Sequence, residues 1–149
     1  MAANRDRSRA RGWTLQVLYA ADLRDAARPS EVLQDFLLRR RIAEGSRAYL
    51  KRLVETVEAH REELDARIAA ALTNWRLDRL SAIDRNVLRI GAAELLHPGD
   101  VPPRVAIQEA IRLAERYGTA ESPRFVNGVL DALYREGLAA EGSAPETSA

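Results

Sequence analysis

The stretch from residue 121 to 133 places a basic and an aromatic side chain at the start of a predicted helix. Ser122 is a typical N-cap residue, and Pro123 suits the first helical position. The backbone N–H groups and the positive end of this helix would therefore emerge beside Arg124 and Phe125, which suits an anion or a nucleic acid and not catalysis. The apolar residues of the stretch also recur at helical spacing: Phe125, Val126, Val129, Leu130 and Leu133. This spacing favours a core position for Phe125, so both interpretations of that ring stay open.

Arginine supplies 22 of the 23 basic residues of a chain whose net charge is only +1. A guanidinium can bind a phosphate through two hydrogen bonds and can stack on a base, so the positions of the arginines matter more than their number. Two basic runs stand out: Arg5, Arg7, Arg9 and Arg11 in the first, and Arg39, Arg40, Arg41, Arg47, Lys51 and Arg52 in the second. For residues 39–41 we favour a solvated helix end, because cations are stable at the carboxyl end of a helix.

Several kinds of chemistry are not indicated by the sequence. The chain has no cysteine, no glycine-rich phosphate loop and no dinucleotide-binding motif. Its two histidines, His60 and His97, stand alone in the sequence, and His60 followed by Glu62 and Glu63 does not match the two-histidine zinc motif. The serines fall mainly at helix starts, outside any nucleophile motif. We therefore expect no metal, no cofactor and no enzymatic activity.

Apolar residues return every three or four positions as far as about residue 136, which predicts an all-α protein. Seven helices are expected, capped at Ser30, Ser46, Ser81 and Ser122 where serine precedes the apolar stripe. We expect the first helix over about residues 5–25, the second from Ser30 to near the arginine triplet, and the third from Ser46 to a break at 60–63. The fourth covers about residues 64–72, the fifth runs from Ser81 to His97, the sixth follows Pro103 and stops at Gly118, and the seventh runs from Ser122 to near Gly137. These form a single domain over residues 1–137, in two subdomains of about 5–60 and 61–137, followed by a disordered tail over 138–149.

Composition also bears on location. No segment offers about 18 uninterrupted apolar residues, and the amino terminus has no apolar core like that of a signal peptide. The absence of cysteine fits a reducing compartment. A cytoplasmic protein without a membrane association is therefore expected.

Four segments together resemble the NusB family of transcription antitermination factors: residues 7–19, 81–95, 100–118 and 121–133. The strings Ala-Ile-Gln-Glu-Ala-Ile and Phe-Val-Asn-Gly-Val-Leu are specific when they occur in this order and spacing. The resemblance implies about seven helices in two subdomains. It also implies pairing with the ribosomal protein NusE and binding of the single-stranded boxA element of nascent ribosomal RNA transcripts. Together with other Nus factors at RNA polymerase, such an assembly suppresses termination and aids transcript maturation.

The resemblance also assigns roles to residues of this chain. The residues expected to contact RNA are Arg7, Arg9, Arg11, Tyr19, Glu121, Arg124 and Phe125. Those expected to contact the protein partner are Asp84, Arg85 and Arg89. Asn127 and Gly128 are expected to be packing residues behind the RNA surface, and Arg124 and Phe125 are expected to lie near the first helix.

Two other functions remain open from the sequence. Some RNA cytosine methyltransferases carry a NusB-like domain, although this chain has no methyl-donor segment. A purely protein-binding helical module would leave the arginines merely solvated. The family includes both monomers and self-associating members, so a homodimer is also open.

Overall fold

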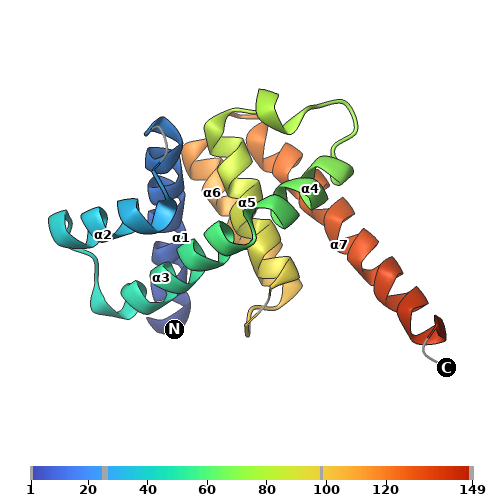
Figure 1. The fold of residues 1–149 in the computed structure, drawn as a ribbon, viewed down its shortest axis with the longest axis horizontal. Coiled ribbons are helices and arrows are strands. Elements are labelled where there is room, and N and C mark those ends of the chain that lie inside the picture. Colours follow the sequence, from blue (N-terminus) through green and yellow to red (C-terminus); the bar gives the residue numbers. More distant parts are fainter. Residues whose placement is uncertain (1, 25–26, 98, 148–149) are drawn as a thin grey trace.

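The computed structural model describes residues 2–24, 27–97 and 99–147, with side chains described between residues 4 and 138 of these ranges. The described part is all-helical, as predicted (Figure 1). Its elements are α1 (Ala2–Leu23), α2 (Pro29–Arg39), α3 (Glu44–Ala59), α4 (Arg61–Ala71), η1 (Leu77–Arg79), α5 (Ala82–Leu96), α6 (Pro103–Tyr117) and α7 (Ser122–Thr147). None of the described helices is both long and apolar enough to cross a bilayer.

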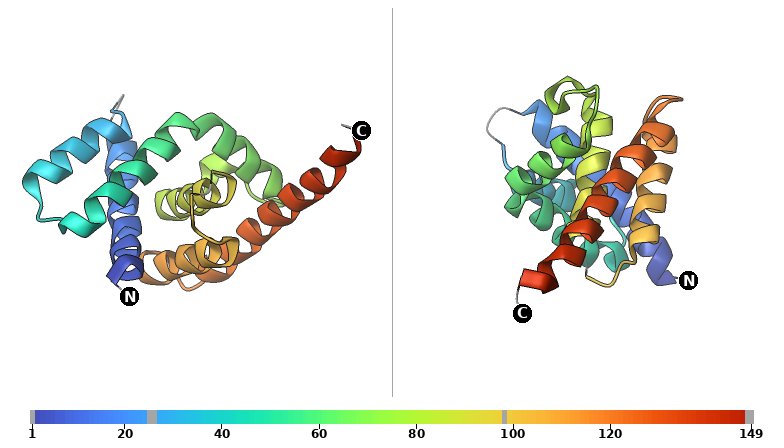
Figure 2. Two further views of the ribbon diagram at one scale, coloured as in Figure 1. Left: turned by 90° about the horizontal axis from the view of Figure 1, so that it is seen from below. Right: turned by 90° about the vertical axis from the view of Figure 1, so that its right-hand side faces the viewer.

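Helix α5 is the central element of the fold. It packs against α1, α3, α4, α6 and α7. In Figure 1, α1 and α2 lie to one side of α5, α6 lies behind it, and α7 extends to the other side. Figure 2 shows the carboxyl-terminal part of α7 extending away from this bundle. All nine residues from Asn86 to Glu94 are buried, and three of them are polar or charged: Asn86, Arg89 and Glu94. A central helix of this kind needs hydrogen-bond partners inside the protein, because unpaired buried charges are strongly destabilising.

The predicted cap at Ser81 is confirmed, whereas that at Ser30 is wrong. The Ser81 hydroxyl accepts a hydrogen bond of 3.1 Å from the backbone N–H of Asp84 and starts α5. Helix α2 begins one residue before Ser30, at Pro29, whose fixed φ suits the first turn. The Ser30 hydroxyl and backbone N–H instead donate to the carboxylate of Glu58 on α3, so a tertiary contact has replaced the local cap.

Ser46 and Ser122 also bond to other parts of the chain and do not cap the helices predicted to start there. Ser46 lies inside α3 and donates to the backbone carbonyl of Asp6 on α1 at 3.1 Å. Ser122 is buried, and its hydroxyl accepts a bond of 3.0 Å from the backbone N–H of Thr119. This contact folds Ser122 against Gly118, where an added Cβ would lie 2.5 Å from the Ser122 hydroxyl oxygen. Glycine at position 118 is what permits the tight turn between α6 and α7.

Helix α7 continues past Gly137, where the sequence predicted its end, and reaches Thr147. The residues after Gly137 begin with Leu-Ala-Ala-Glu, which are strong helix formers. The sequence also predicted a boundary between two subdomains at about residue 60, where His60 separates α3 from α4 in the structure. The division into two subdomains and a tail stays a prediction, and the buried apolar residues of the described chain form one cluster that includes both halves.

Candidate nucleic-acid interface

The arginines near the amino terminus are divided between different sides of α1. Residues two apart on an α-helix point about 200° away from each other, so alternating arginines cannot share one face. Arg5 and Arg9 are exposed, Arg7 is half-buried, and Arg11 retains only 3% of its accessible surface. The basic run therefore splits into an outer pair and an inner pair.

Arg11 is held inside the protein by two carboxylates. Its Nε lies 2.9 Å from both carboxylate oxygens of Glu94, and one of its terminal nitrogens lies 2.8 Å from a carboxylate oxygen of Glu109. Both glutamates are buried as well, and they accept further hydrogen bonds from the hydroxyls of Tyr49 and Ser8. No guanidinium enclosed in this way can reach a phosphate, so the expectation that Arg11 contacts RNA is corrected to a structural role.

The protonation states of this network follow from its surroundings. Burial opposes the charged form of Arg11, but the hydrogen bond and the charge of Glu94 more than offset it and raise the pKa of the guanidinium. Burial and the hydrogen bond to Glu94 also raise the pKa of the Tyr49 hydroxyl far above its usual range. The Tyr49 hydroxyl therefore stays protonated and donates its hydrogen bond to Glu94. The network consists of one cation, the Arg11 guanidinium, between the carboxylates of Glu94 and Glu109.

Arg7 lies at the edge of this network, where solvent reaches it. It forms an ion pair of 2.8 Å with Asp100, the side chains being 28% and 68% exposed, and its guanidinium stands 4.8 Å from the centre of the Tyr49 ring. The hydrogen bond from Arg7 lowers the pKa of the Asp100 carboxyl. Arg7 is thus accessible, but it already has a partner.

A groove between α1 and α6 has the composition that nucleic acids require. Its volume is about 400 Å³, and it brings Arg9 of α1 together with the arginines and the tyrosine at the end of α6. The groove is lined by Ser8, Arg9, Arg11, Gly12, Trp13, Gln16, Glu109, Arg112, Leu113, Arg116 and Tyr117. It adjoins a second groove of about 420 Å³ that runs past Arg7 and Asp100. Exposed cations for phosphates and aromatic rings for bases are therefore combined in one place.

Residues from both helices meet across this groove. Gly12 faces Tyr117, and an added Cβ would lie 3.6 Å from the tyrosine hydroxyl, in ordinary van der Waals contact. The Arg116 guanidinium lies 5.4 Å from the centre of the Tyr117 ring, which holds a cation beside the aromatic surface. Tyr19 is 38% exposed and follows Gly12 by seven positions, so it extends the same side of α1.

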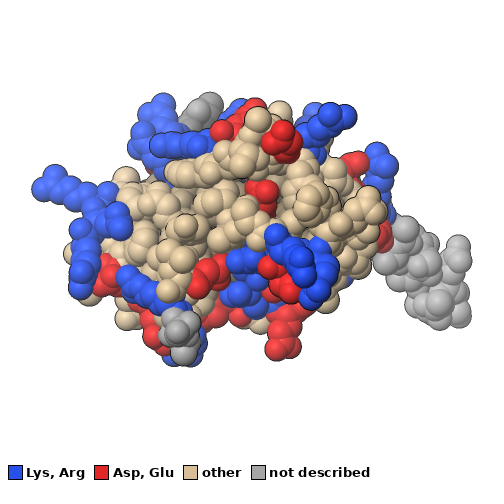
Figure 3. All heavy atoms as spheres, turned by 90° about the horizontal axis from the view of Figure 1, so that it is seen from above, with Lys and Arg blue, Asp and Glu red and all other residues tan. Residues whose placement is uncertain are grey.

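On the face shown in Figure 3, the basic side chains do not form one continuous patch. They gather in separate clusters, one of them near the centre, with acidic side chains among them and uncharged surface between them. This distribution agrees with the net charge of only +1. Attraction to a polyanion must therefore be local, at sites such as the groove between α1 and α6.

The first turn of α7 presents both exposed and half-buried candidates. Glu121 and Arg124 are exposed, whereas Phe125 is half-buried against the core. The Phe125 ring meets the ring of Trp75 edge to face, with 6.3 Å between ring centres, and Trp75 is 61% exposed. Phe125 therefore joins the edge of the core and supports an exposed aromatic side chain from the loop after α4.

The prediction that Asn127 and Gly128 are packing residues is wrong. Both residues are exposed, and a Cβ added to Gly128 would meet no atom within 4 Å. They lie on the same side of α7 as Arg124, at three and four residues after it, and this side faces solvent. The glycine therefore does not serve close helix packing.

The three residues expected to contact the protein partner differ in their exposure to solvent and in their internal hydrogen bonds. Arg89 is buried, with Nε 2.8 Å and one terminal nitrogen 3.0 Å from the two carboxylate oxygens of Asp65, so we correct its role from partner contact to internal pairing. Arg85 is partly exposed and donates to the carbonyl of Leu80. Asp84 is half-buried, and its Oδ1 is the buried side-chain atom that lacks a hydrogen-bond partner among the described residues.

Nine of the eleven residues that line the groove were not predicted from the sequence to contact RNA, among them Trp13, Gln16, Arg112, Arg116 and Tyr117. Arg112 and Arg116 are four apart on the polar side of α6, a spacing that was visible in the sequence. Their relation to Arg9 was not visible, because it depends on how α1 crosses α6.

Comparisons with known proteins give a consistent result. The family model described as the NusB family matches residues 8–135 of the chain. The transcription antitermination protein NusB of Desulfosudis oleivorans is 40% identical over 143 residues, which cover 94% of this chain and 92% of that protein. The protein of the same name from Acidothermus cellulolyticus is 46% identical over 127 residues, covering 85% and 86% of the two chains.

Solved structures are similar as well. The T. maritima NusB structure superimposes with a TM-score of 0.80 at 35% identity, covering 87% of this chain and 91% of that one. A crystal structure of antitermination factors NusB and NusE in complex with dsRNA contains a chain with a TM-score of 0.79 at 34% identity, covering 89% and 98%. The similarity therefore covers nearly all of the helical bundle.

Proposed function

The chain belongs to the NusB family, and on this basis we propose that it is a transcription antitermination factor that pairs with ribosomal protein NusE. The pair binds the single-stranded boxA element of nascent ribosomal RNA, suppresses premature termination and aids maturation of the transcript. The protein acts by assembly and makes or breaks no covalent bond. Its place of action is the bacterial cytoplasm, where RNA polymerase produces the transcript.

The groove between α1 and α6 carries the RNA-binding part of this proposal. Arg9, Arg112 and Arg116 line it from two helices, and the Arg112 side chain is 69% exposed. Three guanidinium groups around one groove can neutralise successive phosphates of a single strand. Trp13 and Tyr117 offer ring faces on which unpaired bases can stack.

We propose that Tyr19, Glu121, Arg124 and Arg7 also contact RNA. Tyr19 lies on the same side of α1 as the groove, and the turn after Tyr117 leads directly to Glu121 and Arg124. Arg124 adds a phosphate ligand, while the Glu121 carboxylate can accept a hydrogen bond from a base amino group. Arg7 contributes from the adjoining groove, once its pairing with Asp100 is exchanged for a phosphate.

For NusE, we propose a contact through the start of α5. Arg85 is partly exposed there, and Asp84 has a carboxylate oxygen without a partner among the described residues. A small side-chain rotation would present this oxygen to a donor on the partner protein. The buried pair of Arg89 and Asp65 acts behind this surface by holding α4 against α5.

The proposal is tested by RNA binding in the presence of NusE. The complex is expected to bind boxA RNA more tightly than scrambled RNA, and substitution of Arg9 or Arg116 by Ala should weaken binding. Each lost phosphate contact should also flatten the dependence of log K on log salt concentration by about 0.7. Arg28→Ala is the matched control, because this arginine is 71% exposed and lies outside the groove.

Three results would contradict the proposal. Equal affinity for boxA and scrambled RNA would remove the sequence-specific function, and NusE binding without any RNA affinity at low salt would favour a purely protein-binding module. Methyl transfer to RNA by the purified chain would contradict the absence of catalysis.

A further inference from the structure

The two histidines, which are far apart in the sequence, lie face to face in the structure. Their ring centres are 3.7 Å apart and the ring planes differ by 20°. His60 occupies the turn between α3 and α4, and His97 directly follows α5. The expectation that these histidines stand alone is therefore wrong, because the ends of α3 and α5 bring them together.

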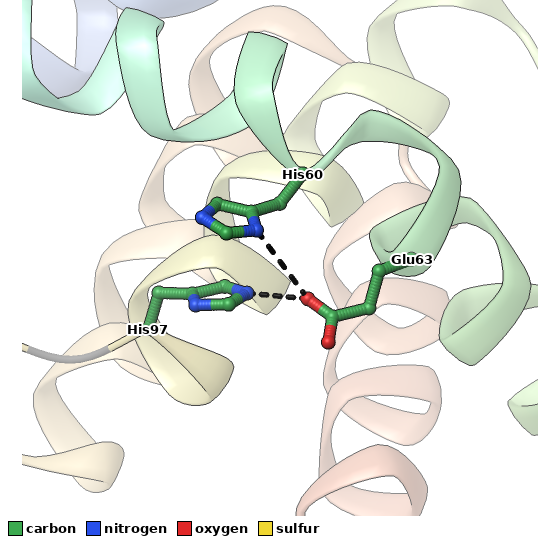
Figure 4. A group of neighbouring side chains, drawn as sticks. All are labelled: His60, Glu63 and His97. Atoms are coloured by element: carbon green, nitrogen blue, oxygen red, sulfur yellow. Dashed lines mark hydrogen bonds and ion pairs between the residues drawn. The ribbon is translucent and has the colours of Figure 1, made fainter.

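A carboxylate completes the cluster. Glu63 lies in the first turn of α4, and Figure 4 shows one of its carboxylate oxygens beside the two stacked imidazoles, facing a nitrogen of each ring. The same oxygen, Oε1, is 2.5 Å from Nε2 of His97 and 3.8 Å from Nδ1 of His60. All three candidate ligand atoms lie within 4.8 Å of one another.

We propose that His60, Glu63 and His97 form a binding site for a divalent transition metal ion, with Zn²⁺ as the best-suited ion. Two imidazole nitrogens and one carboxylate oxygen are a ligand set that zinc accepts, with bonds of about 2.0 to 2.2 Å. A water molecule would complete the tetrahedron. The site is independent of the RNA-binding function proposed above.

Small side-chain movements suffice to form the site. Tetrahedral ligand atoms are about 3.3 Å apart, so the distance between His97 and Glu63 must widen and that between His60 and Glu63 must shorten. The nearly parallel rings also require one imidazole to rotate, so that both lone pairs point at one ion. The His60 side chain is 43% exposed and that of Glu63 52%, which leaves room for rotation about the soft terminal torsions.

The charges around the cluster set limits on its affinity. Glu63 supplies the negative charge, while Arg67 is near enough to act on it electrostatically. Arg52 lies against Gly99, two residues after His97. The positive charges of Arg67 and Arg52 weaken the binding of any divalent ion. The site therefore favours ions that form strong bonds with imidazole nitrogen and disfavours Mg²⁺ and Ca²⁺, which prefer oxygen ligands.

Metal binding here would join two parts of the bundle. The ion would connect the turn between α3 and α4 to the end of α5, and the loop that follows His97 carries Asp100, the partner of Arg7. A metal ion that binds only the folded state raises the free energy of unfolding by RT ln(1 + [L]/Kd), where [L] is the concentration of free metal. The expected effect is thus a metal-dependent increase in Tm.

The composition of the chain makes this proposal easy to test. It contains two histidines and no cysteine, so untagged full-length protein has no other imidazole or thiolate ligands. Titration with Zn²⁺ followed by calorimetry should show one ion per chain, and Co²⁺ should give the visible absorption of a tetrahedral site. With zinc at about 100 times Kd, Tm should rise by roughly 8 °C.

Variants identify the ligands. His60→Gln, Glu63→Gln and His97→Gln should each weaken zinc binding by at least about tenfold, judged from the 10- to 100-fold effects of groups that only support a ligand. Glu62→Gln is the matched control, since it removes the same charge one residue away from the cluster and should bind zinc like the wild type. Circular dichroism establishes that each variant is folded.

The imidazole NMR signals provide a test that needs no variant. Zinc should shift the ring resonances of both histidines together, with saturation at one equivalent. The proposal is overturned if zinc up to 1 mM neither binds stoichiometrically nor shifts these resonances, or if His60→Gln and His97→Gln bind zinc as tightly as the wild type. The cluster would then be an ion pair and a ring stack only.

Discussion

Replacement of Arg11 by alanine tests whether this arginine stabilises the fold or binds RNA. The guanidinium is almost completely buried and makes three hydrogen bonds to two buried carboxylates, those of Glu94 and Glu109. Arg11→Ala would leave both carboxylates inside the protein without their cation. By contrast, Arg9 is exposed and lines the groove between α1 and α6.

The size of the effect follows from burial. Removing one partner of a buried ion pair costs about 3 to 5 kcal/mol, because the remaining charge is left uncompensated. A single domain is stable by only about 5 to 15 kcal/mol, so Arg11→Ala should remove a large fraction of the total. At roughly 3 °C per kcal/mol for a chain of this size, Tm should fall by roughly 9 to 15 °C.

Two measurements on the Arg11→Ala and Arg9→Ala variants distinguish a structural role from RNA binding. Urea unfolding can be followed through the fluorescence of Trp13, whose ring packs edge-on against Phe36 at the contact of α1 with α2. The salt dependence of boxA binding reports the number of phosphate contacts. It is measured in the presence of NusE, at a temperature well below the Tm of each variant. Arg11→Ala should lower the urea midpoint and keep the salt slope, whereas Arg9→Ala should keep the midpoint and flatten the slope by about 0.7.

Arg11→Lys and Arg7→Ala serve as controls. Lysine keeps the positive charge but lacks the planar fork, so Arg11→Lys should be of intermediate stability. Arg7→Ala removes a solvent-accessible pair with Asp100 and should change the urea midpoint only slightly. The reasoning is refuted if Arg11→Ala unfolds at the wild-type urea concentration and flattens the salt slope as Arg9→Ala does.

Three further predictions concern two glycines and one carboxylate. Gly118→Ala should cost about 1 to 3 kcal/mol in the free energy of unfolding, since its Cβ would lie 2.5 Å from the Ser122 hydroxyl oxygen; an unchanged Tm would contradict this. Gly128→Ala should instead add about 0.5 to 1 kcal/mol, because the space around this helical glycine is open, and a lower Tm would show that the position is packed. Arg7 lowers the pKa of Asp100 below its ordinary value of 3.8. The stability that this pair contributes is therefore present above about pH 4 and is lost as the pH falls through the folded-state pKa. Carboxyl NMR titration of Arg7→Ala should show the pKa of Asp100 returning to its ordinary range.

The helical class and most helix positions could be predicted from the sequence. Apolar residues at intervals of three and four identify a helix without reference to any partner, because the pattern depends only on the 3.6-residue period. The start of α5 at Ser81 was predictable for the same reason, since a cap is a bond between near neighbours in the chain. Family-specific strings added the expected partners, because short motifs are also local.

Local signals failed where a distant residue competes for the same group. Ser30 and Ser46 have the chemistry of N-caps, yet their hydroxyls donate to Glu58 and to the carbonyl of Asp6. Arg9 and Arg11 have the same side chain and stand two residues apart, and only the carboxylates supplied by α5 and α6 distinguish an exposed arginine from a buried one. The sequence shows which donors exist, but not which acceptors surround them.

The sequence by itself therefore determined the helices, their approximate boundaries and the family to which the chain belongs. Only the tertiary structure decided which arginines are available to a phosphate, that Gly128 faces solvent, and that His60 and His97 stack. The physical reason is the range of the interactions. Helix periodicity and capping act over a few residues, whereas burial, ion pairing and metal coordination depend on side chains that meet only when helices pack.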